Sequence, residues 1–191
     1  MKKDKILINI ENLSDIEKYK KIGINNFLFA VKDFSIGYKT FSLEEIQKQD
    51  CKKYLLINKI FNNVDCENFN NIIDELKDID GIIFEDIAVY NILKNKNINL
   101  IWNQSHFATN TSSIKYWLEY TNSAVLSNEL TFEEVNNILN NSIKPLVLNV
   151  FGKNPIMYSR RTLLKDSKFP QEKLKQDSIQ STTFIVLKLL I

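Results

Sequence analysis

The polar side chains best placed for chemistry follow an apolar run near the carboxyl end of the chain. Leu146 to Val150 is typical of a buried strand, and the breaker Gly152 to Pro155 ends it. Tyr158, Ser159, Arg160 and Arg161 come directly afterwards. Adjacent arginines can bind a phosphate or carboxylate through paired N–H donors. The sequence therefore predicts an anion-binding site here, and the alternative is the basic first turn of a surface helix.

Other expected strands also end in polar residues. Glu85 and Asp86 follow one apolar run, Asn103 to His106 follow the next, and Glu129 lies beyond a third. Because parallel strands of an α/β fold present their carboxyl ends at one edge, we expect these groups to meet. The predicted catalytic residues are Asp86, Glu129 and Tyr158, and the predicted substrate-binding residues are Ser159, Arg161, Gln104 and His106.

Each of these side chains also has a structural alternative. Asp86 and Glu129 have the residue type of helix caps or ion-pair partners, and Arg161 would then pair with Glu129 to fasten two units together. His106 is the only histidine in the chain, and a lone histidine often serves packing or a loop. No triad of nucleophile, base and orienting group can be identified from the sequence.

The elements that must position these residues alternate between apolar runs and amphipathic segments. Ser14, Ser42 and Thr131 each precede a glutamate by three residues, which predicts capping boxes at three helix starts. The alternation predicts an α/β fold of parallel strands and outer helices, and a helix is expected over residues 68–79. Since neither GxGxxG nor GxxxxGK occurs, we expect a TIM-like (β/α) barrel, incomplete at about seven units, with an open doubly wound sheet as the alternative. The predicted strands are Lys5–Ile10, Phe27–Val31, Tyr54–Asn58, Gly81–Phe84, Leu100–Trp102, Ala124–Leu126 and Leu146–Val150.

The end of the chain departs from this pattern. The one remaining candidate for an eighth strand, Phe184 to Leu190, follows a polar stretch with little helical periodicity and fits the repeat poorly. We therefore expect a barrel domain over residues 1–166 and an atypical tail, truncated or altered, over residues 167–191. A missing eighth unit would leave unpaired strand edges, which predicts dimerisation, recruitment of another subunit or aggregation.

Composition limits the class of protein. The 191 residues are 44% hydrophobic and 25% charged, as in soluble globular proteins, and no apolar segment is long enough to cross a bilayer. We expect no membrane association and a cytoplasmic location. The net charge of +2 is too small to argue for a nucleic-acid partner by itself. Cys51 and Cys66 form no CxxC pattern, so the sequence predicts no metal site.

Two segments resemble motifs of the peptidase U32 family. Val125 to Val135, VLSNELTFEEV, resembles the family's VLSREL-S-L-E-E-I motif, and Val150 to Leu164 resembles its signature V-H-G-x-x-C-x-x-Y-S-G-R-C-L-L. The segments Phe34–Ile46, Ile82–Val89 and Asn103–Thr111 are similar to other family segments in the same order, so the resemblance covers roughly Lys5 to Leu164.

The resemblance implies a barrel-like catalytic domain. Family members were first called collagenase-like peptidases, and others hydroxylate tRNA or rRNA bases or the ubiquinone ring, several of them with an iron–sulfur cluster on four cysteines. It therefore implies a protein of RNA-base modification or peptide hydrolysis, with RNA or a small anionic ligand as its partner. The alternative is a non-catalytic partner or scaffold for a second, cluster-containing U32 subunit.

Departures from the signature affect the cofactor. Pro155 and Thr162 stand where the family has its cysteines, and Phe151 stands in place of the histidine. Proline and threonine cannot replace thiolate ligands, so we expect no cofactor in this chain. Arg160 replaces the glycine before the signature arginine, and Asn128 replaces the arginine of the earlier motif. The residues that survive are Asp86, Glu129, Gly152, Tyr158, Ser159 and Arg161.

Overall fold

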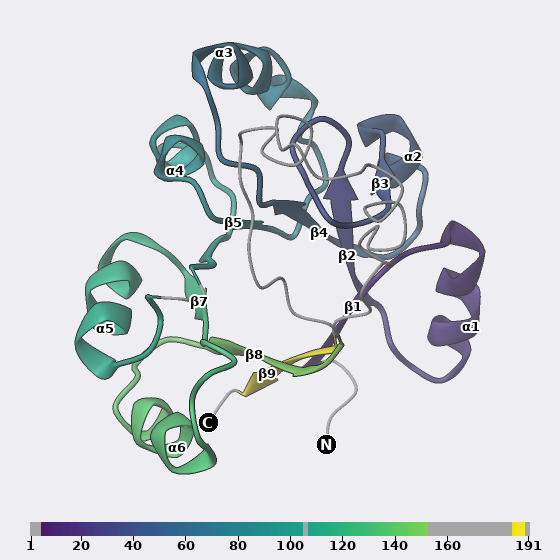
Figure 1. Cartoon of the computed structure of the whole chain (residues 1–191). Coiled ribbons are helices and arrows are strands. Elements are labelled where there is room, and N and C mark those ends of the chain that lie inside the picture. Colours follow the sequence, from purple (N-terminus) through teal and green to yellow (C-terminus); the bar gives the residue numbers. More distant parts are fainter. Residues whose placement is uncertain (1–4, 105–106, 153–184, 190–191) are drawn as a thin grey trace, which may run out of the picture.

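Each of the seven expected apolar runs forms a strand of one curled parallel sheet (Figure 1). The computed structural model describes residues 5–104 and 107–152, together with the backbone of residues 185–189. A short additional strand, β3 (Thr40–Phe41), pairs with the second strand. The main parallel strands are β1 (Ile6–Asn9), β2 (Asn26–Val31), β4 (Lys52–Ile57), β5 (Gly81–Phe84), β6 (Leu100–Trp102), β7 (Ser123–Val125) and β8 (Leu146–Phe151).

The strands follow one another around the sheet in chain order. β1 pairs with β2, β2 with β4, and each strand from β4 to β7 with the next, always in parallel. Parallel neighbours need crossover connections, and helices supply them on the outside of the curl (Figure 1). This arrangement confirms the predicted α/β fold, an incomplete TIM-like barrel whose described residues form seven parallel strands with helices between them.

The gap between β8 and β1 is filled by β9 (Ile185–Leu189), which runs antiparallel to both neighbours. The expected terminal strand therefore exists, but it supplies no β/α unit, because its direction is opposite to that of the other strands. The expectation of unpaired edges on the first and last strands is wrong, since β9 bonds to both. The predicted domain boundary at 166/167 lies outside the described residues.

The outer layer consists of short helices packed on the sheet through alternate strand residues. Phe27, Phe29, Phe84 and Trp102 point outward from their strands into one large core shared with the helices. The helices are α1 (Ile16–Lys21), α2 (Leu43–Gln47), α3 (Asn63–Asn71), α4 (Ile87–Leu93), α5 (Thr111–Tyr120) and α6 (Phe132–Asn140), with 3₁₀ turns η2 (Leu13–Asp15) and η3 (Ile73–Glu75). No helix within the described residues is long and apolar enough to cross a membrane.

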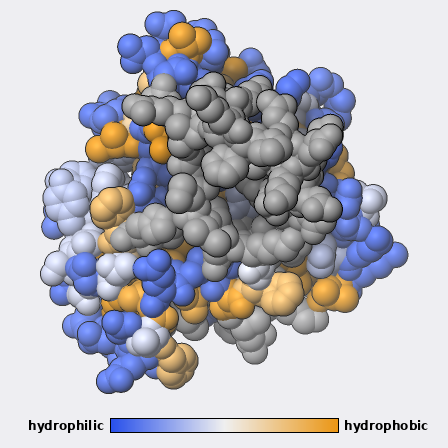
Figure 2. All heavy atoms as spheres, viewed as in Figure 1, coloured by the Kyte–Doolittle hydropathy of each residue, from blue (hydrophilic) through white to orange (hydrophobic). Residues whose placement is uncertain are grey.

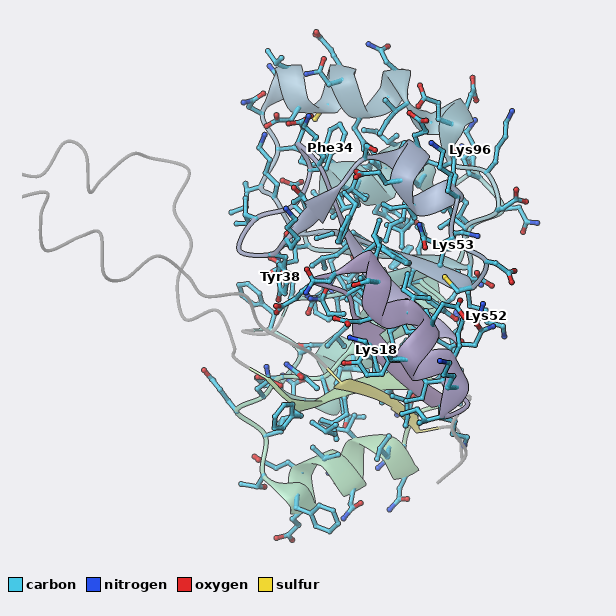
Figure 3. The ribbon with its side chains drawn as sticks, turned by 90° about the vertical axis from the view of Figure 1, so that its right-hand side faces the viewer. Lys18, Phe34, Tyr38, Lys52, Lys53 and Lys96 are labelled. Atoms are coloured by element: carbon cyan, nitrogen blue, oxygen red, sulfur yellow. The ribbon has the colours of Figure 1, made fainter. Side chains whose placement is uncertain are left out.

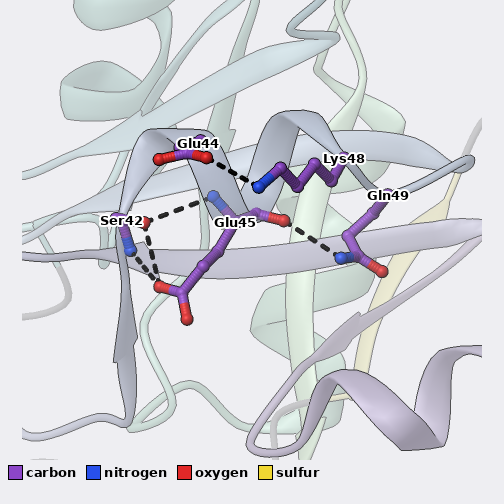
Figure 4. Close-up of polar contacts among 5 residues, drawn as sticks. All are labelled: Ser42, Glu44, Glu45, Lys48 and Gln49. Carbon is purple, nitrogen blue, oxygen red and sulfur yellow. Dashed lines mark hydrogen bonds and ion pairs between the residues drawn. The ribbon is translucent and has the colours of Figure 1, made fainter.

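Two of the three predicted capping boxes are present. Ser42 and Glu45 exchange bonds at the start of α2: the Glu45 N–H donates to Ser42 Oγ (3.2 Å) and the Ser42 N–H to Glu45 Oε2 (2.8 Å) (Figure 4). Thr131 and Glu134 do the same for α6. The prediction at Ser14 is wrong, because Ser14 lies within the η2 turn and lacks the extended backbone that a capping residue needs.

The helix expected over residues 68–79 is also displaced. α3 ends at Asn71 and starts earlier than expected, at a capping box of Asn62 and Asp65. Only the short η3 turn continues the predicted helix.

The barrel interior has its own, smaller core. Leu28, Leu56, Ile83 and Ile101 point inward from adjacent strands, and Tyr38 and Tyr54 pack against this interior cluster. Figure 3 shows Tyr38 at the end of the barrel where the strands finish, and Lys52 and Lys53 at the opposite end. Tyr38 therefore lies at the carboxyl end of this interior, and Lys52 and Lys53 lie at its amino end (Figure 3). The other interior residues are Leu7, Ala30, Val125 and Val147.

Candidate functional site

A layer of polar side chains covers the apolar interior at the carboxyl end of the barrel. Side chains alternate along a strand, so the residue two positions after an interior residue faces the same side. This rule places Asn58 above Leu56 and Glu85 above Ile83. The same rule places Asn9, Lys32 and Asn149 at this end from β1, β2 and β8. We call the residues that follow β4 to β7 the strand-end layer; its members are Asn58, Glu85, Asn103 and Ser127.

Glu85 is the ionisable member of the strand-end layer. Asn103 Nδ2 donates to Glu85 Oε1 (3.1 Å), and Gln104 Nε2 donates to the Glu85 carbonyl oxygen (2.8 Å), so both the side chain and the backbone of Glu85 are held. Burial raises the pKa of the Glu85 carboxyl to about 7, because a low-dielectric environment disfavours the charged form. Glu85 can therefore gain or lose a proton near neutral pH.

The loop between β2 and β3 closes one side of the site. Asn58 fixes it through two bonds to the Ile36 backbone, accepting from the N–H (2.9 Å) and donating to the carbonyl (3.1 Å). Buried Ser35 accepts from the Val31 N–H (2.9 Å) and donates to the Leu56 carbonyl. The loop thereby holds Tyr38 against the interior, where burial, followed by the charge of Glu85, raises the pKa of Tyr38. A ring and an ionisable carboxyl thus lie near each other at the barrel mouth.

A model of the peptidase U32 family, "Peptidase family U32", matches residues 10–174 of the chain. The chain belongs to the peptidase U32 family. Neither the curated proteins nor the solved structures contain a match to it. In this U32 chain the matched range spans the barrel strands from β2 to β8 and the strand-end layer.

Asp86, predicted to be catalytic, has both carboxylate oxygens bound to backbone N–H groups. Oδ1 accepts from Ala88 (2.8 Å) as the N-cap of α4, and Oδ2 accepts from Phe61 (2.8 Å) in the loop before α3. The structure thus shows the helix-capping role that the sequence left open as an alternative. A catalytic role for Asp86 remains a prediction.

The other predicted residues are spread around the same end of the barrel. Glu129 is exposed in the turn after β7, where its backbone N–H donates to Ser127 Oγ (3.2 Å). Gln104 lies beside Glu85 through the bond to its carbonyl. His106, Tyr158, Ser159 and Arg161 lie outside the described residues, so the predicted meeting of Arg161 with Glu129 and Asp86 remains a prediction.

Glu85 was expected among the polar groups at the strand ends, but the catalytic role was predicted for its neighbour Asp86 and not for Glu85. The signal that distinguishes the two is strand parity: Ile83 faces the interior and Phe84 faces the helices, so Glu85 faces inward and Asp86 outward. Counting from the buried strand residues could have identified Glu85 from the sequence.

The cysteines of this U32 chain do not fit a shared cluster. Cys51 precedes β4 at the amino end of the barrel, and Cys66 lies in α3, which follows the carboxyl end of the same strand. Burial raises the pKa of the Cys51 thiol to about 11, which disfavours the thiolate that iron binds. Among the described residues no three His, Cys, Asp or Glu side chains gather as a metal site. Pro155 and Thr162, at the signature positions, lie outside the described residues.

Proposed function

We propose that this U32 chain takes part in the modification of RNA bases, and that the carboxyl end of its barrel binds the base. The observation that carries the proposal is Glu85, a carboxyl group that is half-buried above an apolar interior and has a pKa of about 7. A protonated carboxyl has an O–H donor beside a carbonyl acceptor. That pair complements the adjacent N–H and C=O groups on the edge of a nucleobase.

The surroundings of Glu85 suit a planar ring. Asn103 donates to Oε1, so the proton of the neutral carboxyl is carried by Oε2, and Oε1 keeps a second acceptor site for an N–H of the base. Half-buried Tyr38 provides ring surface near the carboxyl, above the buried interior residue Ile83, and a base can pack on that ring through its face. Specificity for a ring with an N–H edge would then come from Glu85, and affinity from the apolar contact.

The predicted phosphate-binding residues complete this proposal. In it, Arg161 binds a phosphate of the RNA backbone, with Ser159 and Tyr158 beside it, because a guanidinium binds phosphate through paired donors. Hydroxylation by family members that hold an iron–sulfur cluster needs thiolate ligands, and this chain has two cysteines. We therefore assign any cluster chemistry to a partner U32 subunit and base binding to this chain.

The test compares modified nucleosides in RNA. Total tRNA and rRNA would be digested and analysed by mass spectrometry from the source strain, from a strain lacking this gene, and from the deletion strain carrying wild-type, Glu85→Leu, Glu85→Gln or Glu67→Leu protein. Glu67 is an exposed carboxylate on α3 and provides the matched control. We expect a hydroxylated nucleoside to disappear on deletion, to return with wild type and Glu67→Leu, and to stay low with Glu85→Leu. Glu85→Gln should restore it at least in part, because glutamine keeps a donor beside a carbonyl acceptor.

Two results would contradict the proposal. Unchanged nucleosides in the deletion strain would exclude a role in RNA-base modification. Cleavage of collagen-derived peptides by the purified protein, lost in Glu85→Gln, would instead assign the site to peptide hydrolysis. Full rescue by Glu85→Leu would leave RNA modification in place but remove Glu85 from it, as expected if the chain is only a scaffold.

A further inference from the structure

An exposed group of aromatic residues lies on the outer surface of α4 and α5, away from the strand-end layer. Tyr116 and Tyr120 of α5 are 56% and 47% exposed, and Ile87 of α4 is 58% exposed. Figure 2 shows pale, weakly polar side chains at the left edge, where α5 lies in Figure 1. Exposed tyrosines that lie side by side are typical of protein interfaces, where aromatic residues are enriched.

The rings are held in place by a continuous aromatic stack. Trp117 stacks on buried Trp102 of β6 at 4.8 Å between centroids, and Tyr116 meets the edge of Trp117 at 6.0 Å. Tyr120 lies 5.3 Å from Tyr116, and Tyr90 of α4 lies 6.2 Å from Tyr120. A hydrogen bond with Tyr116 also raises the pKa of Tyr120. The exposed rings are therefore preorganised, which lowers the entropy cost of binding.

The exposed side of α5 has two parallel columns of side chains. Residues four apart lie in one column of a helix, so Lys115 and Glu119 form one column, and Tyr116 and Tyr120 form the next. Among the residues that the structure describes, neither Lys115 nor Glu119 forms an ion pair. We call this surface the α5 face; its exposed residues are Ser112, Lys115, Tyr116, Glu119 and Tyr120.

This pattern of columns is self-complementary. Consider a two-fold axis that lies in the plane of the interface and runs perpendicular to α5. It places each column of one copy opposite the same column of the second copy, with the two helices running in opposite directions. With the axis near the middle of α5, Lys115 faces Glu119 of the second copy, and Tyr116 faces Tyr120 of the second copy. The Lys115–Glu119 pair is ideal when the axis is level with residue 117, and the Tyr116–Tyr120 pair when it is level with residue 118. These positions differ by one residue, roughly 1.5 Å along the helix, which side-chain rotamers can accommodate.

We propose that the α5 face is the interface of a two-fold symmetric dimer of this chain, with antiparallel α5 helices in contact. This dimer does not depend on sheet edges, which β9 already pairs, nor on the proposed function. The two half-exposed tyrosines present on the order of 200 Å² per copy, which is below the roughly 800 Å² per partner of a stable interface. The dimer is therefore weak and forms in the micromolar range or above.

The test reverses charges on the α5 face and measures the sedimentation coefficient of the protein at concentrations from about 1 µM to about 1 mM. Lys115→Glu leaves two carboxylates in the column, and Glu119→Lys leaves two ammonium groups. In a dimer of either variant, residues of like charge therefore face and repel each other. We expect each to weaken self-association by at least about tenfold. The double variant K115E/E119K restores the pairing with reversed signs and should associate like wild type. An equimolar mixture of the two single variants should form heterodimers.

Both changes are on exposed positions of α5, and unchanged melting temperatures would show that the fold is intact. A wild type that remains monomeric throughout the range overturns the proposal. So does a dimer that is insensitive to Lys115→Glu, or a mixture of the single variants that fails to associate. Quenching of the aromatic fluorescence by single-stranded RNA, lost in Tyr116→Ser and seen without dimers, would assign the α5 face to nucleic acid instead.

Discussion

The two ends of the barrel use polar side chains for different purposes. At the amino end, side chains at or next to the strand starts bond to the backbone of a neighbouring strand, at distances from 2.8 to 3.0 Å. Such bonds satisfy backbone groups that the sheet leaves open. They tie β2 to β1, β5 to β4, β6 to β5, and β7 to β6 and β8. The side chains are those of Asn26, Asp80, Asn99, Asn122 and Ser123.

At the carboxyl end, the polar side chains hold loops and an ionisable group. Asn58 and Ser35 fix the loop that holds Tyr38, and Asn103 holds Glu85, whose pKa is shifted toward neutrality by burial. Burying an ionisable carboxyl costs stability, whereas the amino-end bonds add to it. The amino-end bonds stabilise the barrel, although a cavity of about 290 Å³ also opens there beside Asn26 and Tyr54. In our proposal the carboxyl end retains the groups for a ligand, as in other (β/α) barrels.

The largest effect we predict comes from filling space at the amino end. A Cβ at Gly81 would lie 3.0 Å from the Tyr54 ring and 3.2 Å from the Asn99 carbonyl oxygen, which also accepts from the Ile82 N–H. Gly81→Val should therefore lower the free energy of unfolding by about 2 to 3 kcal/mol in urea denaturation.

The matched control lies at the carboxyl end. Gly37 has φ of +75°, and a Cβ added there would have no atom within 4 Å, so Gly37→Ala meets backbone strain without a clash. It should cost about 1 kcal/mol. Equal losses for the two variants would mean that the amino end is no more tightly packed than the loop.

The second effect is the pH dependence caused by Glu85. Folding raises the pKa of its carboxyl from 4.5 to about 7, so the folded protein binds an extra proton between these pH values. The contribution of Glu85 to the free energy of unfolding should then be highest below pH 4.5, fall as pH rises toward 7, and become level above it. Glu85→Gln should lack this decline, since glutamine does not titrate and can still accept from Asn103.

The measurement is the difference in unfolding free energy between Glu85→Gln and wild type, followed from pH 4 to pH 8. It should rise by roughly 2 kcal/mol, less than a fully buried carboxyl would give, because Glu85 is half-buried. Glu67→Gln, on an exposed helix surface, should show no such rise. A difference that stays level with pH would mean that Glu85 is solvated, and the contrast between the two ends would lose its main support.

The sequence predicted the elements well and the site less well, for physical reasons. The apolar runs predicted both ends of β5 and of β6 correctly, because no other pattern competes in these buried strands. The direction of β9 could not be predicted, since it depends on how the chain returns to the gap rather than on local pattern. The roles of Asp86 and Glu85 depended on which side of the strand each side chain faces, and adjacent carboxylates look equivalent without that count.

The smallest effect separates local from global stabilisation by comparing one asparagine from each end. Asn122→Ala removes the acceptor for the Leu100 N–H at the amino end, and Asn58→Ala removes both bonds to Ile36 at the carboxyl end. Each should lower the free energy of unfolding by about 1 kcal/mol, the usual net value of such bonds.

Hydrogen exchange of the backbone amides then distinguishes the two variants. Asn58→Ala should release the Ile36 amide and the loop around Tyr38 while leaving the strands protected, because the loop opens without the barrel. Asn122→Ala should instead reduce the protection of β6 and β7 together. If Asn58→Ala lowered the protection of the whole sheet equally, the loop would be part of the barrel's cooperative unit, and the carboxyl end would be as structural as the amino end.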